Sequence, residues 1–157
     1  IKGATVDAAA GLLPAIGAID AGGDAVMRGP GPSGRGWQVE IEDPADPTRT
    51  RAVLAVPRDG AVATSGPSRR RWRVAGRDVH HLIDPRRRAP ADSDLLQATV
   101  LAPRAELADV LAKTAFLLGA GRAGRFLTRF PGVAAVLVRP GGALVVVGQV
   151  AFAGGEP

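Results

Sequence analysis

The chain has 157 residues, a net charge of +5 and a pI near 11.1, and this length is enough for one domain with a proper core. Apolar residues make up 46% of the chain and aromatic residues only 4%, which excludes a disordered protein and requires a core of Ala, Val, Leu and Ile. Cysteine is absent, which excludes disulfides and thiolate metal sites, and no apolar run is long enough to span a bilayer.

The first half of the chain is expected to contain a helix followed by strands. Apolar residues recur at helical spacing from the start of the chain: Val6, Ala9, Ala10, Leu13, Ile16 and Ile19. Residues 19–27 are interpreted as a turn and a strand, and the Gly/Pro/Ser-rich residues 28–36 as a loop. Further strands are predicted to form one antiparallel meander: residues 37–41, 52–56, 62–65 and 72–74.

The second half of the chain is expected to supply the remaining helices and a hairpin. A strand at 99–101 precedes a helix at 104–118, which Pro103 opens and Gly119 ends. The apolar residues of this helix that we expect in the core are Leu107, Val110, Leu111 and Leu118. The other expected elements are a helix at 123–129, a hairpin of residues 133–138 and 143–147, and a flexible tail at 151–157. The prediction is therefore an α+β domain at 1–150, an antiparallel β-sheet packed with helices.

Residues 59–90 hold the side chains most suited to chemistry. An apolar run ends at Thr64-Ser65-Gly66, and such a turn exposes N–H groups and hydroxyls that suit a phosphate or a carbonyl. His80 and His81 are the two histidines of the chain. A strand through both residues would place one imidazole on each face of its sheet.

Five segments in this order resemble motifs of the ApbE family, the FAD:protein FMN transferases. They are Lys2-Gly3 with Asp7, Ala21 to Asp24, Ala63 to Gly66, His80 to Pro85, and the segment from Ala98 to Ala112 that holds a valine-rich strand and an Ala-Asp helix. The chain begins inside the first motif and without Met, so we expect it to be the C-terminal portion of a larger protein. The resemblance implies an ApbE-like, T-fold-like architecture.

The resemblance also implies an activity, the transfer of FMN from FAD to a threonine of a target flavoprotein with release of AMP. His81 is then the catalytic residue and Asp109 a ligand of Mg²⁺. The residues expected to bind FAD are Lys2, Asp24, Ser65, Gly66, Leu82 and Ile83. Ordinary structural roles remain open for three of these side chains: a strand histidine for His81, a solvated terminal lysine for Lys2 and an Asx turn for Asp24.

Lys113 departs from the family, which has Thr at this position. Asp109 and Lys113 are four residues apart and therefore lie on one helix face. One hypothesis is that the Lys113 ammonium binds the FAD diphosphate and partly replaces the cation. The alternative is an ordinary surface ion pair, worth about 0.3–0.5 kcal/mol.

Two arginine clusters, at 69–71 and 86–88, account for much of the positive charge. They are interpreted as a solvated surface or as a basic rim for a polyanion such as FAD. Nucleic-acid motifs are absent, so no nucleic-acid partner is expected. A membrane association would require a segment upstream of Ile1, and cytoplasmic and extracytoplasmic locations both stay open. The alternative functions are a degenerate flavin-binding protein without transfer activity, and a plain nucleotide-binding or interaction domain.

Overall fold

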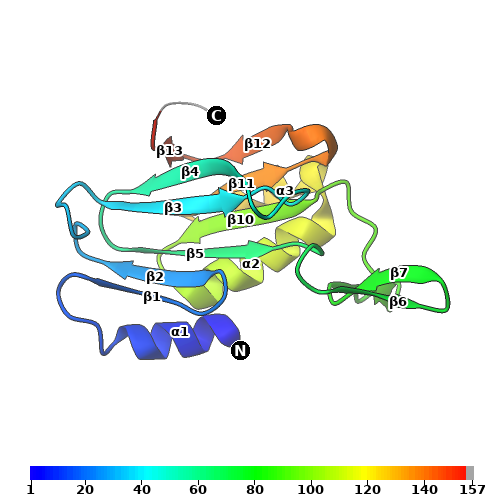
Figure 1. Cartoon of the computed structure of the whole chain (residues 1–157), viewed down its shortest axis with the longest axis horizontal. Coiled ribbons are helices and arrows are strands. Elements are labelled where there is room, and N and C mark those ends of the chain that lie inside the picture. The colour runs from blue at the N-terminus through cyan, green and yellow to red at the C-terminus, as the bar shows by residue number, and fades with distance from the viewer. Residues whose placement is uncertain (155–157) are drawn as a thin grey trace.

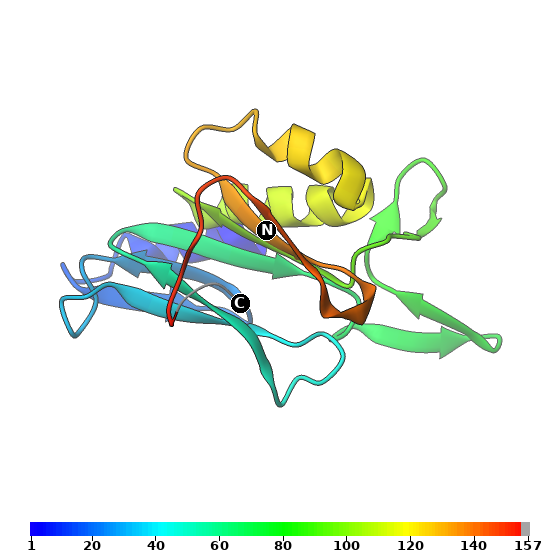
Figure 2. The same ribbon diagram turned by 90° about the horizontal axis from the view of Figure 1, so that it is seen from above.

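The computed structural model describes residues 1–154 and consists of three layers (Figure 1). A six-stranded sheet with the order β1-β2-β5-β10-β11-β12 forms the middle layer, and a three-stranded sheet with the order β13-β4-β3 covers one of its faces. Helices α2 and α3 cover the opposite face (Figure 2). Every pair of neighbouring strands is antiparallel. The predicted α+β class with an antiparallel sheet is thereby confirmed.

Along the strands of the large sheet, successive side chains point alternately toward the helices and toward the second sheet. Their bounds are β1 (Gly17–Asp20), β2 (Asp24–Arg28), β5 (Gly60–Ser65), β10 (Gln97–Ala102), β11 (Ala134–Val138) and β12 (Leu144–Val147). On β10, Ala98 and Val100 face the helices and join a core cluster with Leu111 and Phe116. Val62 of β5 belongs to the cluster that contacts the second sheet. This alternation follows from the period of two in a strand.

The strands predicted to form one meander belong to different sheets. Strands β3 (Trp37–Glu42) and β4 (Thr50–Val56) form the expected hairpin. Strand β5, however, pairs with β2 and β10 rather than with β4. Its residues 61–63 are buried on both faces, and a strand buried on both faces belongs in the middle of a covered sheet. The chain therefore crosses between the sheets after β4.

The tail also differs from the expectation in its first residues. Ala151–Phe152 form β13, which pairs with β4, and the Ala153 N–H donates to Val53 O at 2.9 Å. Residues 155–157 of the expected tail lie outside the described residues. The first three residues of the predicted tail are therefore hydrogen-bonded to β4.

The first helix is shorter than the apolar repeat predicted. Helix α1 (Lys2–Ala10) ends at Gly11. Leu12 is 90% exposed, and Ile19 lies in β1. Gly11 and Pro14 both disfavour continuation of a helix. The apolar residues at helical spacing therefore continue beyond the end of the helix.

Helices α2 (Ala105–Leu118) and α3 (Ala120–Leu127) are separated by Gly119, whose φ is 74°. The prediction for α2 is confirmed within one residue, and α3 begins three residues before its expected start. Val110 was expected in the core but is 55% exposed, because it lies about 200° around the helix from the buried Ala108. The preceding residue, Asp109, is buried instead. A short η1 turn (Pro140–Gly142) joins β11 to β12, as expected.

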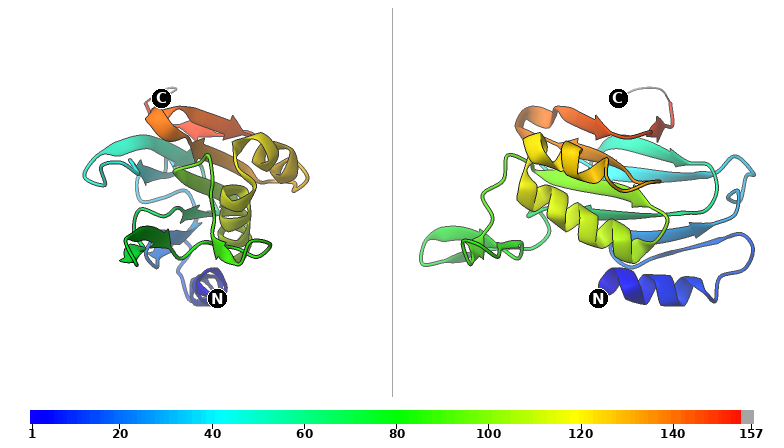
Figure 3. Two further views of the ribbon diagram at one scale, coloured as in Figure 1. Left: turned by 90° about the vertical axis from the view of Figure 1, so that its right-hand side faces the viewer. Right: turned by 180° about the vertical axis from the view of Figure 1, so that it is seen from behind.

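Residues 67–92 form an arm that projects beyond the end of β5 (Figures 1 and 3). It consists of two ribbons: β6 (Arg71–Val74) with β7 (Arg77–His80), and β8 (Ile83–Asp84) with β9 (Ala89–Pro90). The expected strand through both histidines is interrupted, because His80 ends β7 and His81 lies in a bend. Among residues 1–154, no helix is long and apolar enough to cross a membrane.

Candidate functional site

Lys2 and Asp24 meet at the start of β2. The turn before β2 contains Gly22 and Gly23 with φ values of 68° and 90°, which glycine adopts readily. Lys2 Nζ donates to Gly22 O at 2.9 Å and lies 3.1 Å from Asp24 Oδ1. The structure therefore brings together two residues that the sequence assigned separately to FAD binding.

Asp24 is a buried carboxylate, and burying its charge costs free energy. It is 1% exposed, and among the described residues neither of its oxygens accepts a hydrogen bond. Burial raises the pKa of Asp24; the Asp109 carboxylate acts in the same direction, and Lys2 and Lys113 oppose both. Helix α2 packs against β2, the strand that begins at Asp24.

Asp109 and Lys113 form the second pair of this cluster. They are one turn apart on α2, and the Lys113 ammonium donates to Asp109 Oδ1. The Asp109 side chain is 11% exposed, whereas that of Lys113 is 44% exposed. The carboxylate is thus held inside and the ammonium reaches the surface, as expected for a long side chain with a charged end. We call Lys2, Asp24, Asp109 and Lys113 the double pair.

His81 lies in the bend that follows β7. Its Nδ1 is buried and has no hydrogen-bond partner within residues 1–154. Burial lowers the pKa of His81, a hydrogen bond with the Arg70 backbone opposes this effect, and the charges of Arg70, His80 and Lys113 lower the pKa further. The imidazole is therefore neutral at neutral pH, which is the form that accepts a proton.

His80 has a different environment, although it is the adjacent residue. Its Nδ1 accepts the Leu82 N–H at 3.3 Å, and its Nε2 lies 3.1 Å from Ala91 O. Its ring is edge-on to Phe116, with the centroids 6.0 Å apart. Both ring nitrogens therefore hold local structure, and His81 is the histidine whose Nδ1 stays unpaired.

The remaining predicted FAD residues divide between core and surface. Ser65 is 6% exposed at the end of β5, and Leu82 is 5% exposed and belongs to the main core, whereas Ile83 is 48% exposed. A Cβ on Gly66 would lie 2.8 Å from Leu96 O, so close packing against the backbone already explains this glycine. Asp24 pairs with Ala63, which places Ser65 and Gly66 just beyond the start of β2.

Asp7 has a function that the sequence did not reveal. Its Oδ1 accepts the Ala105 N–H at 2.7 Å and its Oδ2 accepts the Glu106 N–H at 2.9 Å. Asp7 therefore caps the N-terminus of α2, whose own N-cap residue, Arg104, makes no side-chain capping bond. The partners are almost a hundred residues apart in sequence, so no local pattern could show the bond. The available signal was that Arg104 is a poor capping residue.

Gly3 lies one turn before Asp7 and permits this docking. A Cβ at Gly3 would stand 2.6 Å from Ala105 O, so a side chain there would push α1 away from α2. Together, Gly3 and Asp7 fix α1 on α2 and thereby hold Lys2 beside Asp24.

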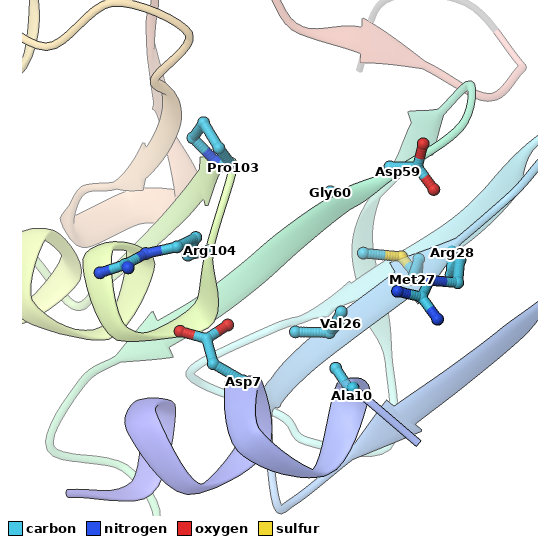
Figure 4. A pocket seen from close by; sticks show the side chains of 10 residues that line it. Asp7, Ala10, Val26, Met27, Arg28, Asp59, Gly60, Pro103 and Arg104 are labelled. Atoms are coloured by element: carbon cyan, nitrogen blue, oxygen red, sulfur yellow. The ribbon is translucent and has the colours of Figure 1, made fainter. Parts of the chain in front are cut away.

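A surface pocket lies near the C-terminal half of α1 (Figure 4). It is lined by Asp7, Ala10, Gly11, Val26, Met27, Arg28, Asp59, Gly60, Pro103 and Arg104. Its two acidic side chains already accept backbone N–H groups, Asp7 from α2 and Asp59 from Gly29 at 2.7 Å. None of the predicted site residues lines this pocket.

The donor set around Asp109 does not fit a magnesium ion. Mg²⁺ requires six oxygen ligands in an octahedron, and Asp109 Oδ1 is engaged by the Lys113 ammonium. Thr114 Oγ1 donates to Val110 O at 2.8 Å and lies about 140° around the helix from Asp109. No group of three or more His, Asp or Glu side chains that could hold a metal occurs in the part of the chain that the structure describes.

Comparison with known sequences and structures agrees with this fold. The model of the ApbE family matches residues 1–149. The FAD:protein FMN transferase of Treponema pallidum (strain Nichols) is 38% identical over 104 residues, which make up 66% of this chain and 29% of that protein. The enzyme of the same name from Haemophilus influenzae is 35% identical over 128 residues, or 78% of this chain and 37% of that protein. The chain belongs to the ApbE family.

Solved structures give the same result for the architecture. The ApbE protein of Thermotoga maritima is 30% identical with a TM-score of 0.78, and the match covers 93% of this chain and 48% of that one. The flavin transferase ApbE of Vibrio cholerae is 24% identical with a TM-score of 0.72, and the match covers 98% and 48%. The chain thus spans less than half of these relatives.

Proposed function

We propose that this chain is the C-terminal portion of an FAD:protein FMN transferase. The observation that supports the proposal best is the buried His81 Nδ1, which has no hydrogen-bond partner within residues 1–154, on an imidazole whose pKa is lowered by burial. The relatives that share the motifs carry the name of this activity. The substrates are then FAD and an acceptor flavoprotein, with a threonine as the target.

The residues allow a balanced transfer step. The threonine Oγ attacks the phosphorus on the FMN side of the FAD diphosphate, and its proton passes to His81. An Oγ–P bond forms, the P–O bond to the AMP phosphate breaks, and AMP leaves with the electron pair. Lys2 and Lys113 lie where their charges would favour binding of the diphosphate and stabilise the leaving phosphate.

The other predicted contacts complete the proposed site. Ser65 and Gly66 would contribute a hydroxyl and backbone N–H groups to the nucleotide, and Ile83 would present an exposed apolar side chain to the ring system. Leu82 would contribute its backbone, since its side chain is in the core. The resemblance implies Mg²⁺ at Asp109, but the donor set does not fit this ion, and the step above uses none.

The test is covalent transfer by the full-length protein. It is incubated with FAD and a threonine-containing fragment of a flavoprotein that carries covalent FMN, and the products are examined by in-gel flavin fluorescence and mass spectrometry. We expect one FMN per acceptor, release of AMP, and no labelling when the acceptor threonine is replaced by alanine. Tight FAD binding without transfer to any threonine acceptor would instead establish the degenerate flavin-binding alternative.

A further inference from the structure

The charges of the double pair balance without a metal ion. Two buried carboxylates, Asp24 and Asp109, face two ammonium groups, Lys2 and Lys113. The side chains of the two acids are 1% and 11% exposed, and those of the two lysines are 39% and 44% exposed. The cations therefore form the outer layer of the cluster, on the side from which a ligand would approach.

We propose that Lys113, together with Lys2, binds the diphosphate of FAD in place of a divalent cation, so that FAD binding by this protein does not require Mg²⁺. The inference rests on the proposed function, because it concerns the nucleotide bound at the same site. It also explains why Asp109 is paired with an ammonium group and why no metal-binding group of three or more His, Asp or Glu side chains occurs within residues 1–154.

The chemistry of lysine supports this arrangement. An ammonium group has three N–H donors, and Asp109 uses one of those of Lys113, which leaves two for phosphate oxygens. Lysine binds phosphate as a point charge and without a fixed coordination geometry. Asp109 would keep the ammonium in position while the flexible stem adjusts to the ligand.

The same arrangement opposes binding of Mg²⁺. An ion at Asp109 would have to displace the Lys113 ammonium from the carboxylate and would be repelled by both lysines. Asp24 offers no easier site, because Lys2 lies 3.1 Å from its Oδ1. Mg²⁺ is small and loses its bound water reluctantly, so it would gain little binding free energy at a carboxylate that is already paired with an ammonium group.

The test measures FAD affinity of the full-length protein in excess Mg²⁺ and in EDTA, for the natural sequence and two variants. For the natural protein we expect the two dissociation constants to agree within about threefold. Lys113→Thr supplies a hydroxyl and frees Asp109, so its affinity should fall at least tenfold in EDTA and recover with Mg²⁺. Lys113→Met keeps the length of the side chain without charge or oxygen, so its affinity should be weak in both conditions.

The outcomes separate this inference from the proposed function. A natural protein that binds FAD in Mg²⁺ and loses tenfold or more in EDTA overturns the inference and leaves the transferase proposal standing. A natural protein that binds FAD in neither condition overturns both. Circular dichroism of the two variants shows whether α2 is intact, and FAD binding by natural protein alone already decides the main point if either variant fails to fold.

Discussion

The double pair and the arm contain the same chemistry in opposite surroundings. In the arm, Arg71 Nη2 lies 2.7 Å from Asp78 Oδ2, and the two side chains are 57% and 47% exposed. In the double pair the lysines are similarly exposed, but the aspartates are almost fully buried. The difference lies in the acid, since only the double pair takes a carboxylate out of water.

This difference decides what each pair can do. Exposed pairs are screened by water and contribute about 0–1 kcal/mol. A buried carboxylate must be paired or must take up a proton, so the lysines of the double pair control the charge state of the site. The arm can lose an ion pair with little consequence, whereas the double pair cannot.

The largest effect is expected at His81, in the bend that follows β7. His81→Ala should lower the rate of FMN transfer by about two to four orders of magnitude, the usual cost of losing a general base. FAD affinity should change little, because the proposed role is proton transfer. Single-turnover labelling of the acceptor measures the rate, and fluorescence titration measures the affinity. Labelling at the natural rate would remove His81 from the mechanism.

The next effect is expected at Asp7, which holds α1 and thus Lys2 in place. Asp7→Ala leaves two N–H groups of α2 without their cap and should lower the free energy of unfolding by about 1–2 kcal/mol. Urea denaturation measures the change. The matched control is Asp92→Ala, because the Asp92 side chain is 87% exposed, and it should stay within about 0.5 kcal/mol. Equal effects of the two substitutions would contradict the capping function.

Asp24 provides a test through pH. Because burial and Asp109 raise its pKa in the folded state above the ordinary value of 3.8, the folded protein binds this proton more tightly than the unfolded chain. The stability that Asp24 contributes is therefore full below pH 3.8 and declines as pH rises through the folded-state pKa, although Lys2 and Lys113 limit the decline.

Asp24→Asn removes this titration. Relative to that of the natural protein, the free energy of unfolding of the variant, measured by urea denaturation between pH 3.5 and 7, should increase as the pH rises across this range. A difference that is independent of pH would show that Asp24 titrates alike in the folded and unfolded states.

The smallest effect is expected in the arm. Arg71→Gln breaks the exposed pair with Asp78 and should cost no more than about 1 kcal/mol, with FAD affinity unchanged. Thermal unfolding and FAD titration of the variant provide both values. A stability loss as large as that of Asp7→Ala would remove the distinction between the buried and the exposed pairs.

Much of this arrangement could be predicted from local sequence. Pro103 and Gly119 set the limits of α2, and the spacing of Asp109 and Lys113 correctly placed them on one face. The pairing of strands could not be predicted in the same way, because β5 reads as the next strand of a meander until its burial on both faces is known. The capping by Asp7 and the partnership of Lys2 with Asp24 depend on tertiary contacts that join distant segments.

The environments of the two histidines could also not be predicted from the sequence. The sequence placed both in one strand, and the resemblance selected His81. The physical distinction between them became visible only when His80 was found bonded to Leu82 N and close to Ala91 O. A bend at His81 breaks the strand, and such a bend has no clear sign in the order of the residues.

The most direct test is a crystal structure of the full-length protein with FAD and Mn²⁺, which replaces Mg²⁺ and gives an anomalous signal. We predict that the diphosphate contacts the Lys113 ammonium, that the flavin phosphate lies within reach of His81, and that no anomalous peak appears at Asp109. A manganese ion bound to the Asp109 carboxylate, with Lys113 turned away, would contradict the account.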